Sequence, residues 1–176
     1  MLRGLVCGLL LVQAATAFAA SASERHGRSA VVTKVSDGDT LWARELLASG
    51  APKGRAFKLR LQGIDAPELC QPGGQQARDA LSKRLLGQQV KWERRATDDY
   101  GRGIVVIEHR GEDVARWMVR QGHAWTYRYR GRTAFDSEQR QAQRERIGLW
   151  RDAKAMEPRQ WRRSKGPCSA SSGSRQ

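Results

Sequence analysis

The strongest local constraint on the fold is a strict alternation of apolar and polar side chains in Phe57-Lys58-Leu59-Arg60-Leu61-Gln62. Successive side chains of a β-strand point to opposite faces, so a period of two predicts a strand with one face in a core. Arg60 then lies on the face opposite to Leu59 and Leu61. The strand ends at residues 63–68, a turn-forming segment that carries two carboxylates.

Short elements of this kind fill most of the chain. Apolar and β-branched runs predict further strands at 30–35, 40–43, 90–92 and 104–107, with a hairpin turn at 36–39, a loop at 46–55 and a hairpin loop at 97–103. Apolar spacing, a capping Asp113 and glycine stops predict three helices, at 75–86, 113–122 and about 135–147. The order favours a mainly β α+β fold, a five-stranded barrel of the oligonucleotide-binding (OB) type with three helices. An α+β sandwich has a similar pattern and stays an alternative.

The N-terminus is typical of a signal peptide. Arg3 precedes an apolar run over 5–20, and small residues follow it. We therefore expect a signal peptide at 1–22 and export to the periplasm or the medium; an uncleaved anchor is the alternative. A flexible lead-in at 23–29, one domain at 30–152 and a basic, partly flexible tail at 153–176 complete the predicted organisation.

The chain is strongly basic, with a formal net charge of +14 and 25 Arg against 7 Lys. Guanidinium groups match phosphate oxygens in pairs, which an ammonium group cannot do. Such a charge favours nucleic acid or an anionic membrane surface as partner. A solvated basic surface without a partner is the third possibility.

Two cysteines, Cys70 and Cys168, remain after signal removal. An even pair in an exported chain predicts a disulfide, with free thiols or intermolecular pairing as alternatives. The bridge would hold the Arg-rich segment 159–165 beside the predicted cleft.

Carboxylates gather in two predicted turns, Asp37 and Asp39 in the first and Asp65 and Glu68 in the second. Clustered carboxylates repel unless a cation lies between them, and hard cations such as Ca²⁺ or Mg²⁺ prefer oxygen ligands. The Cys and His residues lack zinc-ligand spacing. Alternatively, residues 37–39 form an ordinary turn.

Two arginines could complete such a site. Arg60 leads into the second turn, and Arg102 stands between glycines in the hairpin loop. Together they could hold a phosphate and offset charge in its transition state. A solvated strand arginine and a turn residue are the plainer interpretations.

These residues resemble the staphylococcal nuclease-like proteins. The similarity lies in Val35 to Thr40, in Arg60 through Ile64-Asp65-Ala66-Pro67-Glu68, and in Thr97 to Gly103. Val119-Arg120-Gln121-Gly122, the Tyr127/Tyr129 pair and Glu145 to Trp150 are similar to later blocks of the family. The resemblance covers about 30–150.

The resemblance implies an OB-type barrel and Ca²⁺-dependent cleavage of DNA and RNA that leaves 3′-phosphates; Mg²⁺ or Mn²⁺ is the less expected cofactor. It implies the metal ligands Asp39, Asp65 and the main-chain carbonyl of Ala66, with Asp37 as an acidic neighbour. Glu68 matches the general base, and Arg60 and Arg102 match the arginines that bind the phosphate. The residues implied around the nucleotide are Tyr100, Tyr127 and Tyr129.

The chain departs from the family pattern in three places. Ala66 replaces a threonine, which a main-chain ligand tolerates. Asp99 stands where the type member has a lysine near the substrate phosphate, and residues 122–127 are one residue shorter. Terminal-phosphate binding and the two later tyrosines are therefore the least supported part of the resemblance.

Two other function classes compete with a nuclease. A barrel of this kind can bind nucleic acid without cleaving it. A cationic envelope protein that binds anionic lipid would need an amphipathic basic helix, which the sequence lacks. We expect a monomer that acts on DNA or RNA, without stable membrane association once the signal peptide is removed.

Overall fold

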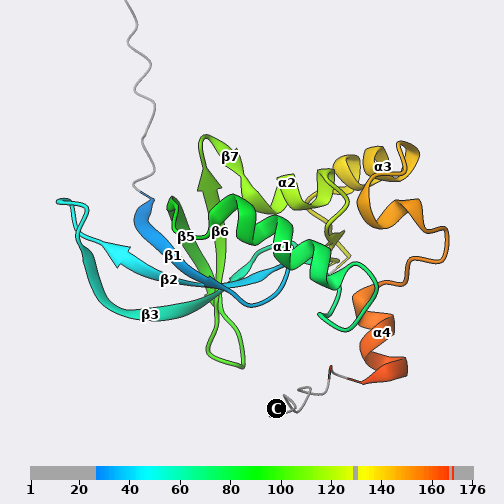
Figure 1. The fold of residues 1–176 in the computed structure, drawn as a ribbon, viewed down its shortest axis with the longest axis horizontal. Coiled ribbons are helices and arrows are strands. Elements are labelled where there is room, and N and C mark those ends of the chain that lie inside the picture. The colour runs from blue at the N-terminus through cyan, green and yellow to red at the C-terminus, as the bar shows by residue number, and fades with distance from the viewer. Residues whose placement is uncertain (1–26, 129–130, 167, 169–176) are drawn as a thin grey trace, which may run out of the picture.

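The computed structural model describes residues 27–128, 131–166 and 168. In this part of the chain, four strands precede the first helix, and the last three elements are helices (Figure 1): β1 (Arg28–Val35), β2 (Thr40–Leu46), β3 (Pro52–Leu61), β4 (Ile64–Asp65), α1 (Gly74–Leu85), β5 (Gln89–Thr97), β6 (Gly103–His109), β7 (Glu112–Asp113), α2 (Val114–Arg120), β8 (Trp125–Thr126), α3 (Asp136–Arg144), the 3₁₀ helix η1 (Gly148–Arg151) and α4 (Pro158–Lys165).

Five strands close into a barrel. The main sheet has the order β3-β2-β1-β5-β6-β7, and its neighbouring pairs are antiparallel. A parallel pairing of β3 with β6, in which Leu59 lies opposite Gly103 and Arg60 opposite Ile104, joins the two sides. The prediction of a mainly β OB-type barrel is therefore confirmed, and the sandwich is excluded.

The core lies inside this barrel and under α1. Leu59 and Leu61 are fully buried on β3, as their alternation predicts. Helix α1 adds Ala77, Leu81 and Leu85, which repeat every four residues and form one apolar face. The structure also confirms the cap of α2, because the Asp113 side chain accepts a hydrogen bond from the Arg116 amide.

Two strands begin earlier in the chain than predicted. Strand β1 starts at Arg28 inside the expected lead-in, and β3 starts at Pro52 inside the expected loop. Pairing with β2, where Leu46 lies opposite Pro52, extends β3 past the apolar alternation. Pairing within the β2–β3 hairpin thus overrides the polar composition of residues 52–56.

A fourth α-helix, α4, lies in the tail at 153–176, which we expected to be partly flexible. Pro158 occupies the first turn of this helix, where a missing N–H costs nothing. In Figure 1, α2 and α3 lie together to one side of the barrel, and α4 lies below them. The expected count of three helices is therefore too low by one α-helix.

Several predictions fall outside the described residues, among them the signal peptide at 1–22 and Tyr129. Within the part of the chain that the structure describes, no helix has the length and apolar character needed to cross a bilayer.

Candidate active site

Asp39, Arg60 and Asp65 meet at one rim of the barrel. The Arg60 guanidinium donates to Asp39 Oδ1 at 2.6 Å and to Asp65 Oδ1 at 2.9 Å. Both aspartates are almost fully buried, at 3% and 2% exposure. Burial alone would lower the pKa of Arg60, but the charges of Asp39 and Asp65 outweigh it and raise the pKa above its ordinary value.

Two further hydrogen bonds, one of them from the second turn, fix the Asp39 side chain. The Ala66 amide donates to Asp39 Oδ2 at 3.0 Å, and the Thr40 hydroxyl donates to Oδ1 at 2.9 Å. Gly38 allows this approach, because a Cβ there would lie 2.7 Å from the Cβ atoms of both Ala66 and Ala77. The turn is therefore pressed against α1 and the second carboxylate turn, which draws residues 39 and 65 together.

Asp37 borders this cluster. Its Oδ1 accepts a hydrogen bond from the Asp39 amide at 3.0 Å. Burial, followed by the charge of Asp39, raises the pKa of Asp37 to about 7. The Asp37 carboxylate is thus short of positive charge on this side of the site.

Glu68 lies in a tight turn that leads into α1. The buried Gln71 side chain accepts a hydrogen bond from the Glu68 amide at 3.2 Å, and the Gln71 amide donates to the Glu68 carbonyl at 2.8 Å. A Cβ on Gly74 would lie 1.9 Å from that carbonyl oxygen, so this turn requires glycine at 74. Gln71 therefore positions Glu68, a role that no sequence signal indicated.

Arg162 of α4 completes the cluster from the outside. Its guanidinium donates to Asp65 Oδ1 at 3.2 Å, to Asp65 Oδ2 at 2.8 Å and to Glu68 Oε1 at 2.9 Å. These bonds, chiefly those to Asp65, raise the pKa of Arg162 above its ordinary value. No sequence signal singled out Arg162, although the predicted disulfide placed the Arg-rich segment 159–165 near the site.

A disulfide joins Cys70 to Cys168, as predicted. Cys70 belongs to the Glu68 turn, and its amide also lies 3.0 Å from the Cys168 sulfur. The neighbouring Gln71 donates to the Met156 carbonyl at 2.6 Å. The C-terminal segment, meaning α4 with Met156 before it and Cys168 after it, is thus attached directly to the turn that carries Glu68.

Arg102 lies apart from the carboxylate cluster. Asp98 accepts hydrogen bonds from the Arg102 amide at 2.9 Å and from Arg102 Nε at 2.6 Å. These contacts outweigh the effect of burial and lower the pKa of Asp98. Among the described residues, the two terminal nitrogens of Arg102 have no hydrogen-bond partner.

The β3–β6 pairing brings the Arg102 loop close to β3. Arg102 directly precedes Gly103, the first residue of β6, and Gly103 lies opposite Leu59 in a parallel register. Since Arg60 follows Leu59, the backbone of Arg102 lies near the part of β3 that carries Arg60.

The tyrosines are less closely tied to the cluster. Tyr100 is 85% exposed in the β5–β6 loop, where the Arg102 guanidinium lies 5.4 Å from its ring centre. Tyr127 is exposed, and its amide donates to the Gly63 carbonyl at 2.8 Å beside β4. Neither side chain hydrogen-bonds to the carboxylates, and Tyr129 is outside the described residues.

The carboxylate oxygens of this cluster suit a hard cation, but the guanidinium groups of Arg60 and Arg162 neutralise the carboxylates in this structure. Asp39 and Asp65 offer only oxygen ligands, which Ca²⁺ and Mg²⁺ prefer. Beside them, burial disfavours the charged form of the Asp37 carboxylate. Within residues 27–128, 131–166 and 168, no three Asp, Glu, His or Cys side chains are arranged to hold a metal ion. The chemistry fits a cation, provided that an arginine moves aside.

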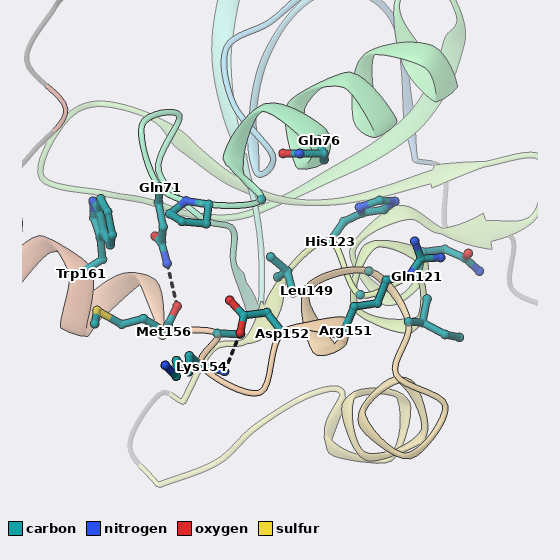
Figure 2. Close-up of a pocket in the computed structure, with 16 residues that line it drawn as sticks. Gln71, Gln76, Gln121, His123, Leu149, Arg151, Asp152, Lys154, Met156 and Trp161 are labelled. Atoms are coloured by element: carbon teal, nitrogen blue, oxygen red, sulfur yellow. Dashed lines mark hydrogen bonds between the residues drawn. The ribbon is translucent and has the colours of Figure 1, made fainter.

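A pocket lies away from this cluster (Figure 2). It has a volume of about 630 Å³ and lies between the start of α1, the residues after α2 and the C-terminal segment. Trp161 and Gln71 lie at one end, and His123 lies at the other. None of the clustered carboxylates lines this pocket, so the candidate site is the open rim of the barrel.

A closed OB-type barrel whose rim carries paired carboxylates and arginines is typical of proteins that bind or hydrolyse nucleic acid. Comparison with known proteins is consistent with this class. Residues 58–152 match the family model described as "Staphylococcal nuclease homologue".

Three relatives extend the similarity. A protein of Haemophilus influenzae named "Uncharacterized endonuclease" is 38% identical over 144 residues, which cover 81% of this chain and 78% of that protein. "Protein ParB" of Escherichia coli is 36% identical, covering 93% and 91%. "Micrococcal nuclease" of Shigella flexneri is 31% identical, covering 93% and 92%.

The chain belongs to the staphylococcal nuclease family. It is therefore a nuclease, a hydrolase whose substrate is nucleic acid, in a family that is generally metal-dependent.

Proposed function

We propose that this nuclease is a Ca²⁺-dependent endonuclease that hydrolyses phosphodiester bonds of DNA and RNA, with Glu68 as general base. One observation carries the proposal: the carboxylates of Asp39, Asp65 and Glu68 form a single ion-paired cluster with Arg60 and Arg162 at the barrel rim. Buried turns fix its members, so the charges are arranged before substrate arrives.

Asp39, Asp65 and the carbonyl of Ala66 would hold the cation, with Asp37 beside them. When bound, the cation would polarise the scissile phosphate and share the negative charge that develops on it. Asp39 and Asp65 are suited to this role because their burial and hydrogen bonds leave them little freedom to reorient.

The arginines would bind the phosphate from the same side. Arg102 offers two terminal nitrogens that have no hydrogen-bond partner among the described residues, while Asp98 fixes its Nε. Arg60 already bridges Asp39 and Asp65, so it would hold one phosphate oxygen close to both carboxylates. Two guanidinium groups would then offset the charge of the pentacoordinate transition state.

Glu68 would take one proton from the attacking water. The water oxygen then forms its bond to phosphorus in line with the P–O5′ bond, which breaks. The 5′-oxygen leaves with a proton from solvent, and the phosphate remains on the 3′-oxygen. Gln71 supports this step because it fixes the turn of Glu68 at both backbone groups. Tyr100 and Tyr127 are exposed enough to contact bases of the bound strand.

A digestion panel tests the proposal. The purified protein is incubated with supercoiled plasmid, linear duplex and RNA, each with Ca²⁺, Mg²⁺, Mn²⁺ or excess chelator. We expect nicking and then degradation with Ca²⁺, and none with chelator. End analysis should find 3′-phosphates. Shifted mobility without cleavage under every condition would instead support a binding module and contradict the proposed chemistry.

We also propose that the protein is exported. The Cys70–Cys168 disulfide supports this, because such bonds persist in oxidising compartments. The test is N-terminal mass mapping of protein isolated from the cell envelope and the medium. A chain that keeps residues 1–22 and remains in the reducing cytoplasm would contradict it.

A further inference from the structure

We propose that Arg162 takes part in the active site. Its guanidinium is an internal cation that pairs with the Asp65 and Glu68 carboxylates and must leave them before a divalent cation binds there. The proposal rests on the function proposed above. It adds a residue that the sequence motifs do not include, from a helix beyond the matched family segment 58–152.

The first support is the division of carboxylate oxygens between the two arginines. Among the described residues, Arg162 is the only donor to Asp65 Oδ2 and to Glu68 Oε1. Asp39, in contrast, is held by Arg60, Thr40 and the Ala66 amide. Removing Arg162 would therefore open one oxygen on a proposed metal ligand and one on the proposed base, and leave Asp39 unchanged.

The second support is that a guanidinium and a metal ion cannot share these oxygens. Each neutralises the same carboxylates, and two cations at one carboxylate pair repel each other. Binding of either cation must then weaken binding of the other, and the coupling is reciprocal. Arg162 thus acts as a competitor that belongs to the protein itself.

The third support is that the contact between Arg162 and the carboxylates can break more readily than the contacts inside the barrel. The Arg162 side chain is 37% exposed and that of Arg60 is 20% exposed. Pro158 is the only buried residue of α4, and Trp161 borders the open pocket of Figure 2. Few apolar contacts hold the helix, so its ionic contact can break without opening the core.

The attachment of α4 keeps Arg162 close after it is released. The Cys70–Cys168 disulfide and the bond from Gln71 to the Met156 carbonyl tie both ends of the segment to the Glu68 turn. A tethered group returns at a high effective concentration. The competition is therefore reversible and does not depend on protein concentration.

Calorimetric titration of Ca²⁺ into metal-free protein, without nucleic acid, tests the proposal. Arg162→Gln is compared with Arg163→Gln, which removes the same charge from an exposed neighbour in the same helix. We expect Arg162→Gln to bind Ca²⁺ at least about fivefold more tightly than wild type. Arg163→Gln should match wild type.

The outcomes separate this inference from the proposed function. Equal Ca²⁺ affinity in the two variants, with wild-type digestion that chelator stops, would overturn only the role of Arg162. Digestion that survives excess chelator would overturn the metal dependence. If none of the three proteins binds a divalent cation, both proposals fail.

A measurement on unaltered protein guards against misfolding of the variant. Amide hydrogen exchange in residues 158–165 should become faster when Ca²⁺ is added to wild type, because α4 loses its ionic anchor. Unchanged or slower exchange at a Ca²⁺ concentration that saturates the site would contradict the competition.

Discussion

The barrel rim and the C-terminal segment hold the carboxylate cluster in different ways. On the rim, Asp39 and Asp65 are buried and share Arg60, and the Ala66 amide also holds Asp39. From outside, α4 reaches Asp65 and Glu68 with one partly exposed arginine and is attached through a disulfide. The rim thus supplies a lasting geometry, whereas the C-terminal segment supplies a positive charge, that of Arg162, which can leave the carboxylates.

The largest effect should come from the proposed base. Glu68→Gln keeps the shape of the side chain but cannot accept the proton from water, so turnover should fall by roughly 10²–10⁴-fold. Initial rates of plasmid digestion at saturating Ca²⁺ measure this. Glu108→Gln, on the exposed face of β6, is the control and should keep its rate. An active Glu68→Gln protein would remove Glu68 from the chemistry.

Arg102→Gly should have the next largest effect. Losing one preorganised donor lowers turnover by roughly 10²–10³-fold. Arg110→Gly is a matched control, because it removes the same charge from a turn with φ of 54°, which glycine adopts easily. Circular dichroism should show both variants folded. If Arg102→Gly keeps more than half of wild-type activity, the assignment of Arg102 is wrong.

The disulfide tests the outer half of the comparison. Cys168→Ser removes a bridge that spans 98 residues of sequence, and such bridges typically contribute about 2–4 kcal/mol. We expect a lower melting temperature and faster hydrogen exchange in α4, with the need for Ca²⁺ unchanged. Reduced wild-type protein should behave in the same way. Loss of metal dependence in this variant would show that the C-terminal segment is part of the lasting geometry.

The smallest effect should come from crowding the rim. A methyl group at Gly38 would press on Ala66 and Ala77, and overpacking of this kind costs about 1–3 kcal/mol. Gly27→Ala is the control, because its nearest neighbour would be 3.6 Å away, an ordinary contact. Urea unfolding compares the two free energies. Equal stabilities would show that the first turn has room to move.

Local pattern was sufficient to predict the parts of the fold whose residues are close in sequence. Alternation predicted the core face of β3, and Asp113 predicted the start of α2. Helix α4 was missed because it buries only Pro158, so its apolar residues show no helical period. Its position depends on contacts with residues 65–71, which are distant in sequence.

The site shows the same limit. Motif blocks pointed to Asp39, Arg60, Asp65 and Glu68, and the structure brings these four side chains into one network. Their roles in catalysis stay predictions. Gln71 and Arg162 lie outside every motif, since glutamine in a turn and arginine in a basic tail are ordinary residues without their three-dimensional partners.

The pairing of β3 with β6 also affects how activity is regained after unfolding. It joins Leu59 to Gly103, residues far apart in the chain, and such contacts are slow to form because a long loop must first close. Arg102 directly precedes β6, and the proposed site needs it near the rim that carries Arg60. In refolding experiments, recovery of cleavage should therefore follow barrel closure, and a chain whose barrel is still open should not cut nucleic acid.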